Sequence, residues 1–158
     1  MFDKWDHRFM EMANLVSGWA SCNRRKVGAV IVKDKRVMTT GYNGAPAGIR
    51  TCVERGECLR QKMGIPSGQR HELCYAVHAE QNAIIQAAKL GINISGATLY
   101  CTHQPCILCA KMIVNSGITR VVYGEGYPDA FAVDMLNEGG VLLEKYEWEK
   151  QDGSKAAE

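Results

Sequence analysis

Apolar positions in the first part of the chain follow two different patterns. Between residues 5 and 17 they recur at helical spacing, from Trp5 to Val16, which predicts an amphipathic helix packed on a core. A continuous apolar run follows at 27–32. A polar turn comes next, and then a short segment at 36–40 that can return as a second strand. Two short runs on either side of a polar turn predict a β-hairpin.

The rest of the chain alternates helical patterns with short apolar runs. Gly91 follows the first of these helices, where a C-terminal cap belongs. The predicted elements are helices at 79–90, 105–116 and 129–138 and strands at 98–102, 120–123 and 141–148. This order predicts an α/β domain with a mixed sheet, antiparallel in the opening hairpin and parallel in the later crossovers.

A long segment between the hairpin and these later elements has a different character. Residues 41–48 are rich in Gly, Ala, Asn and Pro, and such clusters favour turns. Residues 49–75 show no clear periodicity and contain three cysteines. A loop of this length inside a compact domain is usually functional. We therefore expect something other than apolar packing to hold it in place.

Composition and charge narrow the class of protein. The 158 residues are 46% apolar with a net charge of +2, which suits one globular domain at 1–150 followed by a mobile polar tail at 151–158. A protein that coats nucleic acid would carry a basic stripe, and the sequence shows neither a signal peptide nor a membrane span. We expect a cytoplasmic protein that binds neither nucleic acid nor membranes. In that compartment its seven cysteines are expected to be metal ligands or buried thiols rather than disulfides.

Two short motifs carry the candidate chemistry: His78-Ala79-Glu80 and Pro105-Cys106-Ile107-Leu108-Cys109. Each is weak alone, but together, at the starts of two predicted helices, they are typical of zinc deaminases. Cys106 and Cys109 are one helical turn apart, so their sulfur atoms share a side, and the start of a helix favours thiolates. With His78 they make three ligands and leave a fourth zinc position for water, as in catalytic zinc sites.

Glu80 stands two residues after His78, and we interpret it as the acid–base group rather than as a ligand. It can take a proton from the zinc-bound water, protonate ring nitrogen N3 of cytosine and then protonate the departing amine. Hydrolysis at C4 would release ammonia. The alternative is a structural Cys/His zinc site with Glu80 on an ordinary helix surface. The absence of a fourth ligand at the obvious spacing favours the catalytic interpretation.

Four segments resemble the deoxycytidylate (dCMP) deaminase branch of the cytidine deaminase superfamily: HAEQNAI at 78–84, PCILCAK at 105–111, RKVGAVIV at 25–32 and GYNG at 41–44. The resemblance covers nearly the whole chain. It implies a three-layer α/β/α fold around a mixed five-stranded sheet and conversion of dCMP to dUMP for thymidylate synthesis. It also implies activation by dCTP, inhibition by dTTP and assembly into a homo-hexamer.

The same resemblance suggests residues that contact the substrate. It assigns Asn43 to the sugar and Tyr127 to the base pocket, with Ala79 also at the substrate. Arg25 and Lys26 are candidates for the phosphate, because a guanidinium fork or an ammonium group binds that anion well. Simpler interpretations stay open: a turn asparagine, a loop aromatic and a solvated basic turn.

A second group of potential ligands lies in the turn before the hairpin and in the long loop. At the corresponding positions many family members bind a structural zinc, which implies the ligands Cys22, Cys52, His71 and Cys74. Cys58 could replace one of them. Four soft ligands exclude water from the tetrahedron, and the metal would order the loop. The alternative is a set of free thiols. Cys101 fits a buried strand position and receives no role.

Two other functions compete with this hypothesis. One is a deaminase that acts on cytidine, guanine, a riboflavin precursor or tRNA adenosine. A tRNA-editing enzyme should read PCxMCxGA and be more basic, and the free-nucleoside enzymes lack the Cys/His loop. The other is a non-catalytic zinc module, against which the near-neutral charge and the lack of interleaved basic and aromatic residues count. Mutation of Glu80 separates an enzyme from such a module.

Overall fold

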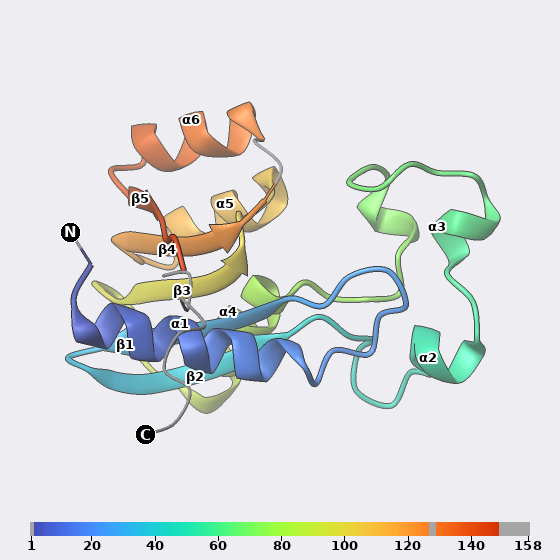
Figure 1. Cartoon of the computed structure of the whole chain (residues 1–158), viewed down its shortest axis with the longest axis horizontal. Helices are drawn as coiled ribbons and strands as arrows, with labels where there is room; N and C mark the ends of the chain where they lie inside the picture. Colours follow the sequence, from blue (N-terminus) through green and yellow to red (C-terminus); the bar gives the residue numbers. More distant parts are fainter. Residues whose placement is uncertain (1, 127–128, 149–158) are drawn as a thin grey trace, which may run out of the picture.

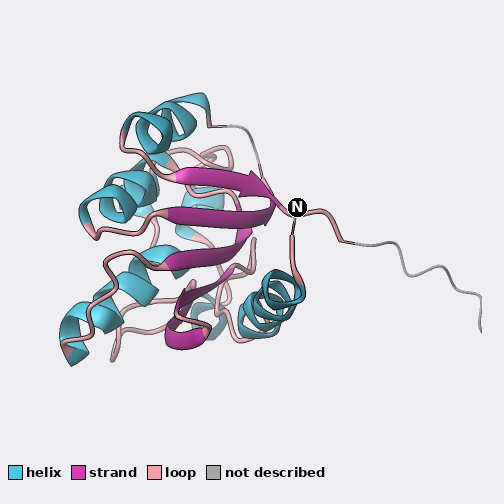
Figure 2. Ribbon diagram, turned by 90° about the vertical axis from the view of Figure 1, so that its left-hand side faces the viewer, coloured by secondary structure: helices cyan, strands magenta, loops and turns pink. Residues whose placement is uncertain are grey.

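Five strands form a sheet with helices on both faces (Figures 1 and 2). The computed structural model describes residues 2–126 and 129–148. Its elements, in chain order, are α1 (Lys4–Ser17), β1 (Gly28–Lys33), β2 (Arg36–Tyr42), α2 (Cys52–Arg55), α3 (Leu59–Lys62), the 3₁₀ helix η1 (His71–Leu73), α4 (Ala79–Leu90), β3 (Thr98–His103), α5 (Ile107–Asn115), β4 (Arg120–Glu125), α6 (Ala130–Glu138) and β5 (Leu142–Lys145).

The sheet has the mixed topology that the sequence predicts. Its strand order is β2-β1-β3-β4-β5; β1 is antiparallel to β2 and β3, and β3, β4 and β5 are parallel. The hairpin closes through Asp34 and Lys35, whose φ angles are 51° and 58°, the left-handed backbone that two-residue hairpin turns require.

Two cores join the three layers. On one face α1 packs alone, and its buried Phe9, Met10, Ala13 and Val16 meet Val30 and Tyr100 of the sheet. On the other face lie α4, α5 and α6 (Figure 2). The predicted three-layer α/β/α fold is therefore confirmed. No helix among the described residues is both long enough and apolar enough to span a lipid bilayer.

Two glycines let helices approach the sheet more closely than any other residue would. A Cβ atom on Gly28 of β1 would lie 2.1 Å from the carbonyl oxygen of Ala13 in α1. A Cβ atom on Gly41 of β2 would lie 2.2 Å from the carbonyl oxygen of Ala79, the first residue of α4. Gly41 therefore seats the start of α4, where the His-Ala-Glu motif lies, directly on the sheet.

Two predicted elements are clearly longer than the observed ones. The helix predicted from residue 105 begins at Ile107, because Cys106 keeps an extended backbone and the Asp129 carboxylate accepts the Ile107 amide, 3.0 Å away. The strand predicted to reach residue 148 ends at Lys145. Its pairing with β4 stops there, and the next residue, Tyr146, buries its ring in the core beneath α1.

The long segment after β2 extends beyond one end of the sheet (Figure 1, right). It is closed at its base by an isolated bridge, in which the Val77 amide donates to the Gly44 carbonyl at 2.8 Å and the Gly44 amide donates back at 3.2 Å. Between these residues the chain forms only the short helices α2, α3 and η1. This matches the weak periodicity of the sequence.

A buried carboxylate ties α1 to the sheet. Asp6 is 5% exposed and accepts hydrogen bonds from the Tyr100 hydroxyl at 2.7 Å and from Nη1 of Arg120 at 2.7 Å. Burial alone would raise the pKa of Asp6, but the hydrogen bonds from Arg120, the Asp3 amide and Tyr100 outweigh it and hold the pKa below its usual value. The ionised carboxylate therefore stabilises the fold.

Replacing Asp6 by Asn is expected to lower the free energy of unfolding by about 3 kcal/mol at neutral pH, since Arg120 loses a buried partner. Because the folded pKa is depressed, the contribution is complete above the unfolded pKa of about 3.9. This stabilisation is lost as the pH falls through the pKa that Asp6 has in the folded protein. Urea denaturation across this range measures it. Glu11→Gln, on an exposed part of α1, is the control, and a loss for Asp6→Asn that does not change with pH would contradict the assignment.

Candidate metal centre and active site

Two helix starts meet at one end of the sheet and bring the two motifs together. His78 is the N-cap of α4 and Cys106 the N-cap of α5. Nδ1 of His78 lies 3.3 Å from Sγ of Cys109 and 3.5 Å from Sγ of Cys106. The side chain of Gln81 accepts the His78 amide at 3.0 Å and holds this turn. The predicted ligands are thus assembled from segments far apart in the chain.

These separations fit a zinc ion. With Zn–S near 2.3 Å and Zn–N near 2.0–2.1 Å, a tetrahedral arrangement places a nitrogen and a sulfur ligand roughly 3.5 Å apart. The two observed N···S distances, 3.3 Å and 3.5 Å, agree with this value. The donor set, one imidazole and two sulfur atoms, is also one that zinc prefers. His78, Cys106 and Cys109 therefore form a site of the right size and chemistry for this metal.

Of the three candidate ligands, Cys106 alone is shifted toward the deprotonated form that binds a metal. Hydrogen bonds from Cys109 and His78 outweigh burial and lower the pKa of Cys106 to about 4, so its thiolate form predominates at neutral pH. The hydrogen bond with Cys106 raises the pKa of His78 against the opposing effect of burial. The hydrogen bond that Cys109 donates to Cys106, together with burial, raises the pKa of Cys109, which keeps its proton. A metal ion would displace the protons of His78 and Cys109 as it binds.

Glu80 lies beside these three residues and forms a second possible ligand group with His78 and Cys109. It is 4% exposed and sits in the first turn of α4, with a carboxylate oxygen within 4.8 Å of the ligand atoms of His78 and Cys109. One oxygen accepts from the thiol of Cys101 at 3.0 Å and the other from Cys109 at 3.4 Å. A carboxylate in this place can exchange protons with a molecule bound at the metal.

His71 lies closer to this site than the sequence suggested. Its ring packs edge-on against that of His78, with centroids 4.7 Å apart, and His71, His78 and Cys106 offer ligand atoms that lie within 4.8 Å of one another. Burial and the charge of His78 lower the pKa of His71. In this structure His71 therefore faces the first metal site, whereas the sequence grouped it with the cysteines of the long loop.

The other predicted ligands form a thiol cluster, which we define as Cys22, Cys52, Cys58 and Cys74. Burial and the neighbouring thiols of Cys74, Cys22 and Cys58, in that order, raise the pKa of Cys52. The Cys52 sulfur atom is therefore within electrostatic reach of the other three. The fourth member that the structure brings in is Cys58, which the sequence analysis treated only as a replacement. Spacing could not decide between Cys58 and His71, because this segment has no regular periodicity.

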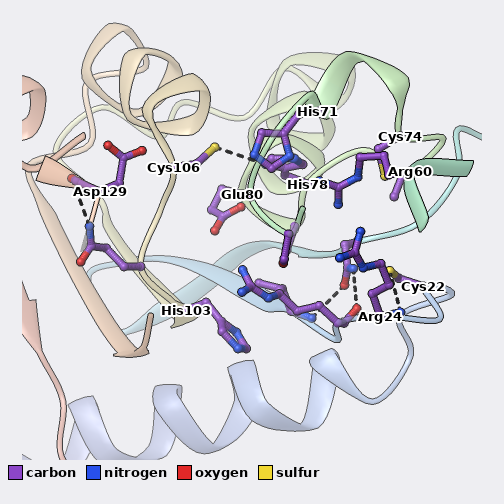
Figure 3. A pocket seen from close by; sticks show the side chains of 18 of the residues that line it. Cys22, Arg24, Arg60, His71, Cys74, His78, Glu80, His103, Cys106 and Asp129 are labelled. Carbon is purple, nitrogen blue, oxygen red and sulfur yellow. Dashed lines mark hydrogen bonds between the residues drawn. The ribbon is translucent and has the colours of Figure 1, made fainter. Parts of the chain in front are cut away.

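A cavity of about 510 Å³ opens over the first metal site (Figure 3), a size typical of small-molecule sites. Asn43, Ala79 and Arg25 line it, but Lys26 is exposed and is not among its lining residues. The side chain of Asn43 accepts the Val27 amide and donates to the Arg25 carbonyl, both at 2.8 Å. Asn43 thus shapes the cavity wall. Tyr127 lies outside the described residues.

Sequence reasoning missed two residues that organise the site. Asp129 accepts the amides of Ile107 and Ala132, at 3.0 Å and 3.1 Å, and so caps both α5 and α6. Because Asp129 directly precedes a helical pattern, the sequence signals that it caps α6. The sequence gives no sign that Asp129 also caps α5. Cys101 is fully buried on β3, and its thiol donates to Glu80. No sequence signal links Cys101 with Glu80, because the contact joins a strand to a helix.

Replacing Cys101 by Val is expected to lower kcat about threefold to tenfold, since a weak thiol donor to a charged acceptor is lost. Valine is apolar, only slightly larger than cysteine and well suited to a strand, so the zinc content and the melting temperature should stay close to those of the wild type. Cys101→Ser should restore part of kcat by restoring a donor. Steady-state kinetics checks this, and a Cys101→Val protein as fast as the wild type would show that the contact does not orient Glu80.

Several known proteins that are similar in sequence and fold are named deaminases. The family model described as "Cytidine and deoxycytidylate deaminase zinc-binding region" matches residues 3–125. The deoxycytidylate deaminase of Enterobacteria phage T4 is 39% identical over 180 residues, covering 89% of this chain and 93% of that protein. The Schizosaccharomyces pombe deoxycytidylate deaminase is 39% identical over 143 residues, covering 90% of this chain. The crystal structure of dCMP deaminase from cyanophage S-TIM5, in complex with dCMP and dUMP, matches with a TM-score of 0.77 and 34% identity, covering 92% of this chain and 99% of that one.

The chain therefore belongs to the cytidine and deoxycytidylate deaminase family, which confirms the resemblance noted in its motifs. It spans 44% of the length of the Schizosaccharomyces pombe protein and 47% of that of the Saccharomyces cerevisiae deoxycytidylate deaminase. The phage proteins are matched over nearly their whole length.

Proposed function

We propose that this chain hydrolyses dCMP to dUMP and ammonia. The observation that carries the proposal is a set of three zinc-type ligands, His78, Cys106 and Cys109, with Glu80 beside them under a cavity large enough for a nucleotide. Relatives named deoxycytidylate deaminase, at 39% identity, support the choice of substrate, as does the related structure with dCMP and dUMP bound.

The residues of the site divide the chemistry among them. Zinc held by His78, Cys106 and Cys109 would supply a Lewis acid that lowers the pKa of water. Glu80 takes the proton from the attacking water and gives it to N3 of the base, while the water oxygen bonds to C4. Glu80 then takes the remaining proton from the new hydroxyl on C4 and gives it to the amine as the bond from C4 to the amino nitrogen breaks, which leaves a carbonyl at C4. One water is consumed and one ammonia released, so the carboxylate ends as it began.

A second zinc at the thiol cluster is part of the proposal. Cys22, Cys52 and Cys74 would hold it, with His71 or Cys58 as the fourth ligand. The electrostatic effect of the other three thiols on Cys52 supports it, as does the scarcity of apolar side chains in the segment that the metal would order. Such a site stabilises a fold by the free energy of metal binding.

The wider role follows the family resemblance. We infer that the dUMP product feeds thymidylate synthesis in the cytoplasm, that dCTP activates and dTTP inhibits the enzyme, and that it assembles as a homo-hexamer. The resemblance in the GYNG segment at 41–44 and the relatives named deoxycytidylate deaminase support this inference.

A substrate panel tests the assignment. Zinc-loaded protein is incubated with dCMP, CMP, deoxycytidine and dCTP, each with and without added dCTP as effector, while the cytosine absorbance is followed. We expect kcat/KM for dCMP to exceed that for each other substrate. Faster turnover of another substrate would support the zinc-dependent deamination but contradict the assignment of dCMP as the preferred substrate. No turnover of any of them by folded, zinc-loaded protein would contradict the enzymatic function.

A further inference from the structure

One side of the cavity is cationic. Arg24 and Arg25, from the segment before β1, and Arg60, from α3, all line it. Figure 3 shows the side chains of Arg24 and Arg60 on the side of the cavity away from Asp129. The carboxylates in the lining, Glu80 and Asp129, accept thiols and backbone amides instead. Within the described part of the chain, Arg24 and Arg60 form no ion pair with these acids.

Arg60 is a buried cation for which the described residues supply no counter-charge. It is 9% exposed, although arginine is seldom so deeply buried without a partner. Its Nη1 donates to the carbonyl of Gln69 at 2.9 Å, but its Nε is buried and has no hydrogen-bond partner. Within residues 2–126 and 129–148 it forms no ion pair. A buried cation without a counter-charge is costly, so this position is suited to an anionic ligand.

Arg24 repeats the pattern on the same cavity. Its Nη1 is also buried without a hydrogen-bond partner. Its side chain also bonds to the thiol of Cys58, where it helps the Gln61 and Arg60 amides to lower the pKa of that thiol against the effect of burial. Across the described residues, Arg24 and Arg60 carry the only two buried side-chain donors or acceptors left unpaired. That both face one cavity indicates a shared ligand.

We propose that Arg60 and Arg24 bind the 5′-phosphate of the substrate and so select nucleotides over nucleosides. The inference rests on the proposed function, which places the cytosine ring at Glu80. A phosphate has the charge and the oxygen geometry that a planar guanidinium binds best. Ser67 and Gly68 line the cavity as well, and Ser67 can add a hydroxyl donor. The assignment differs from the sequence-based one, because Lys26 does not line the cavity and Arg60 gave no sequence signal.

The test separates phosphate binding from a structural role for Arg60. Arg60→Gln is expected to raise KM for dCMP and weaken binding of dUMP, measured by calorimetric titration, by roughly 10- to 100-fold. The turnover number, zinc content and melting temperature should stay near those of the wild type. Arg60→Lys should recover part of the affinity, and Arg24→Gln should change KM in the same direction. Arg50→Gln, exposed in the same long segment, should change neither constant.

Two results would overturn the proposal: an unchanged KM and dUMP affinity in Arg60→Gln, or a fall in kcat with KM unchanged. The second would show that Arg60 only supports the fold of its loop. If the wild type fails to turn over dCMP, the proposed reaction fails instead. The dUMP titration still tests the phosphate site in that case, because product binding needs no turnover.

Discussion

Replacing Glu80 by Gln is expected to lower kcat for dCMP roughly 10²- to 10⁴-fold, the range that a positioned acid–base group contributes. The amide keeps the size of the carboxylate and can still accept from the Cys101 thiol, now 3.0 Å from Glu80. It cannot carry a proton from water to N3 and then to the amine. Ligand atoms are untouched, so the zinc content and the melting temperature should remain those of the wild type.

Steady-state kinetics with purified protein measures this fall in kcat, and metal analysis of the same sample tests whether zinc is retained. Glu72→Gln is the matched control, since Glu72 is an exposed acid of the long segment with no place in the site. Retention of more than about a tenth of wild-type kcat would lie well outside the range for a positioned acid–base group. It would show that Glu80 does not transfer the protons in this reaction.

Removing the metal is expected to have the second large effect. A chelator should abolish turnover, and added Zn²⁺ should restore it, because the ligands alone supply no Lewis acid. We expect two zinc ions per chain. Cys106→Ala should lose one of them together with activity, and Cys52→Ala should lose the other and lower the melting temperature. Leu108→Ala, at an exposed position between the ligands of α5, should keep both.

Metal analysis by mass spectrometry, paired with thermal melts, distinguishes the two sites. His71→Ala and Cys58→Ala complete the set, because the variant that loses the second zinc identifies the fourth ligand of the thiol cluster. A single zinc ion in the wild type, unaffected by Cys52→Ala, would contradict the second site and leave the four thiols as free cysteines.

Regular elements of this fold could be predicted closely from the sequence. The helix predicted at 79–90 is α4, Ala79–Leu90, because its apolar face is periodic and Gly91 ends it in the left-handed conformation, with φ 68°. The positions of His78, Cys106 and Cys109 at the starts of two helices were also predictable, since each motif fixes its own spacing on a helix start. In both cases the deciding physics is local to a few consecutive residues.

The parts that could not be predicted depend on contacts between distant segments. Arg60 lies in a one-turn helix of the long segment, where no period tells which side chain turns inward. His71 follows Arg70, whose backbone is left-handed, and the spacing of His71 and Cys74 does not reveal which cluster the imidazole faces. Cys101 alternates correctly for a buried strand, yet its partner Glu80 comes from another element.

The central claim is hydrolytic deamination at the site formed by His78, Cys106, Cys109 and Glu80. Mass spectrometry of dCMP incubated with zinc-loaded protein in ¹⁸O-water tests it most directly. We expect dUMP that carries one ¹⁸O atom at C4, with one ammonia released per dUMP, and formation of this product at least about 100-fold more slowly by Glu80→Gln. Unchanged dCMP after incubation with folded, zinc-loaded wild-type protein would contradict the account.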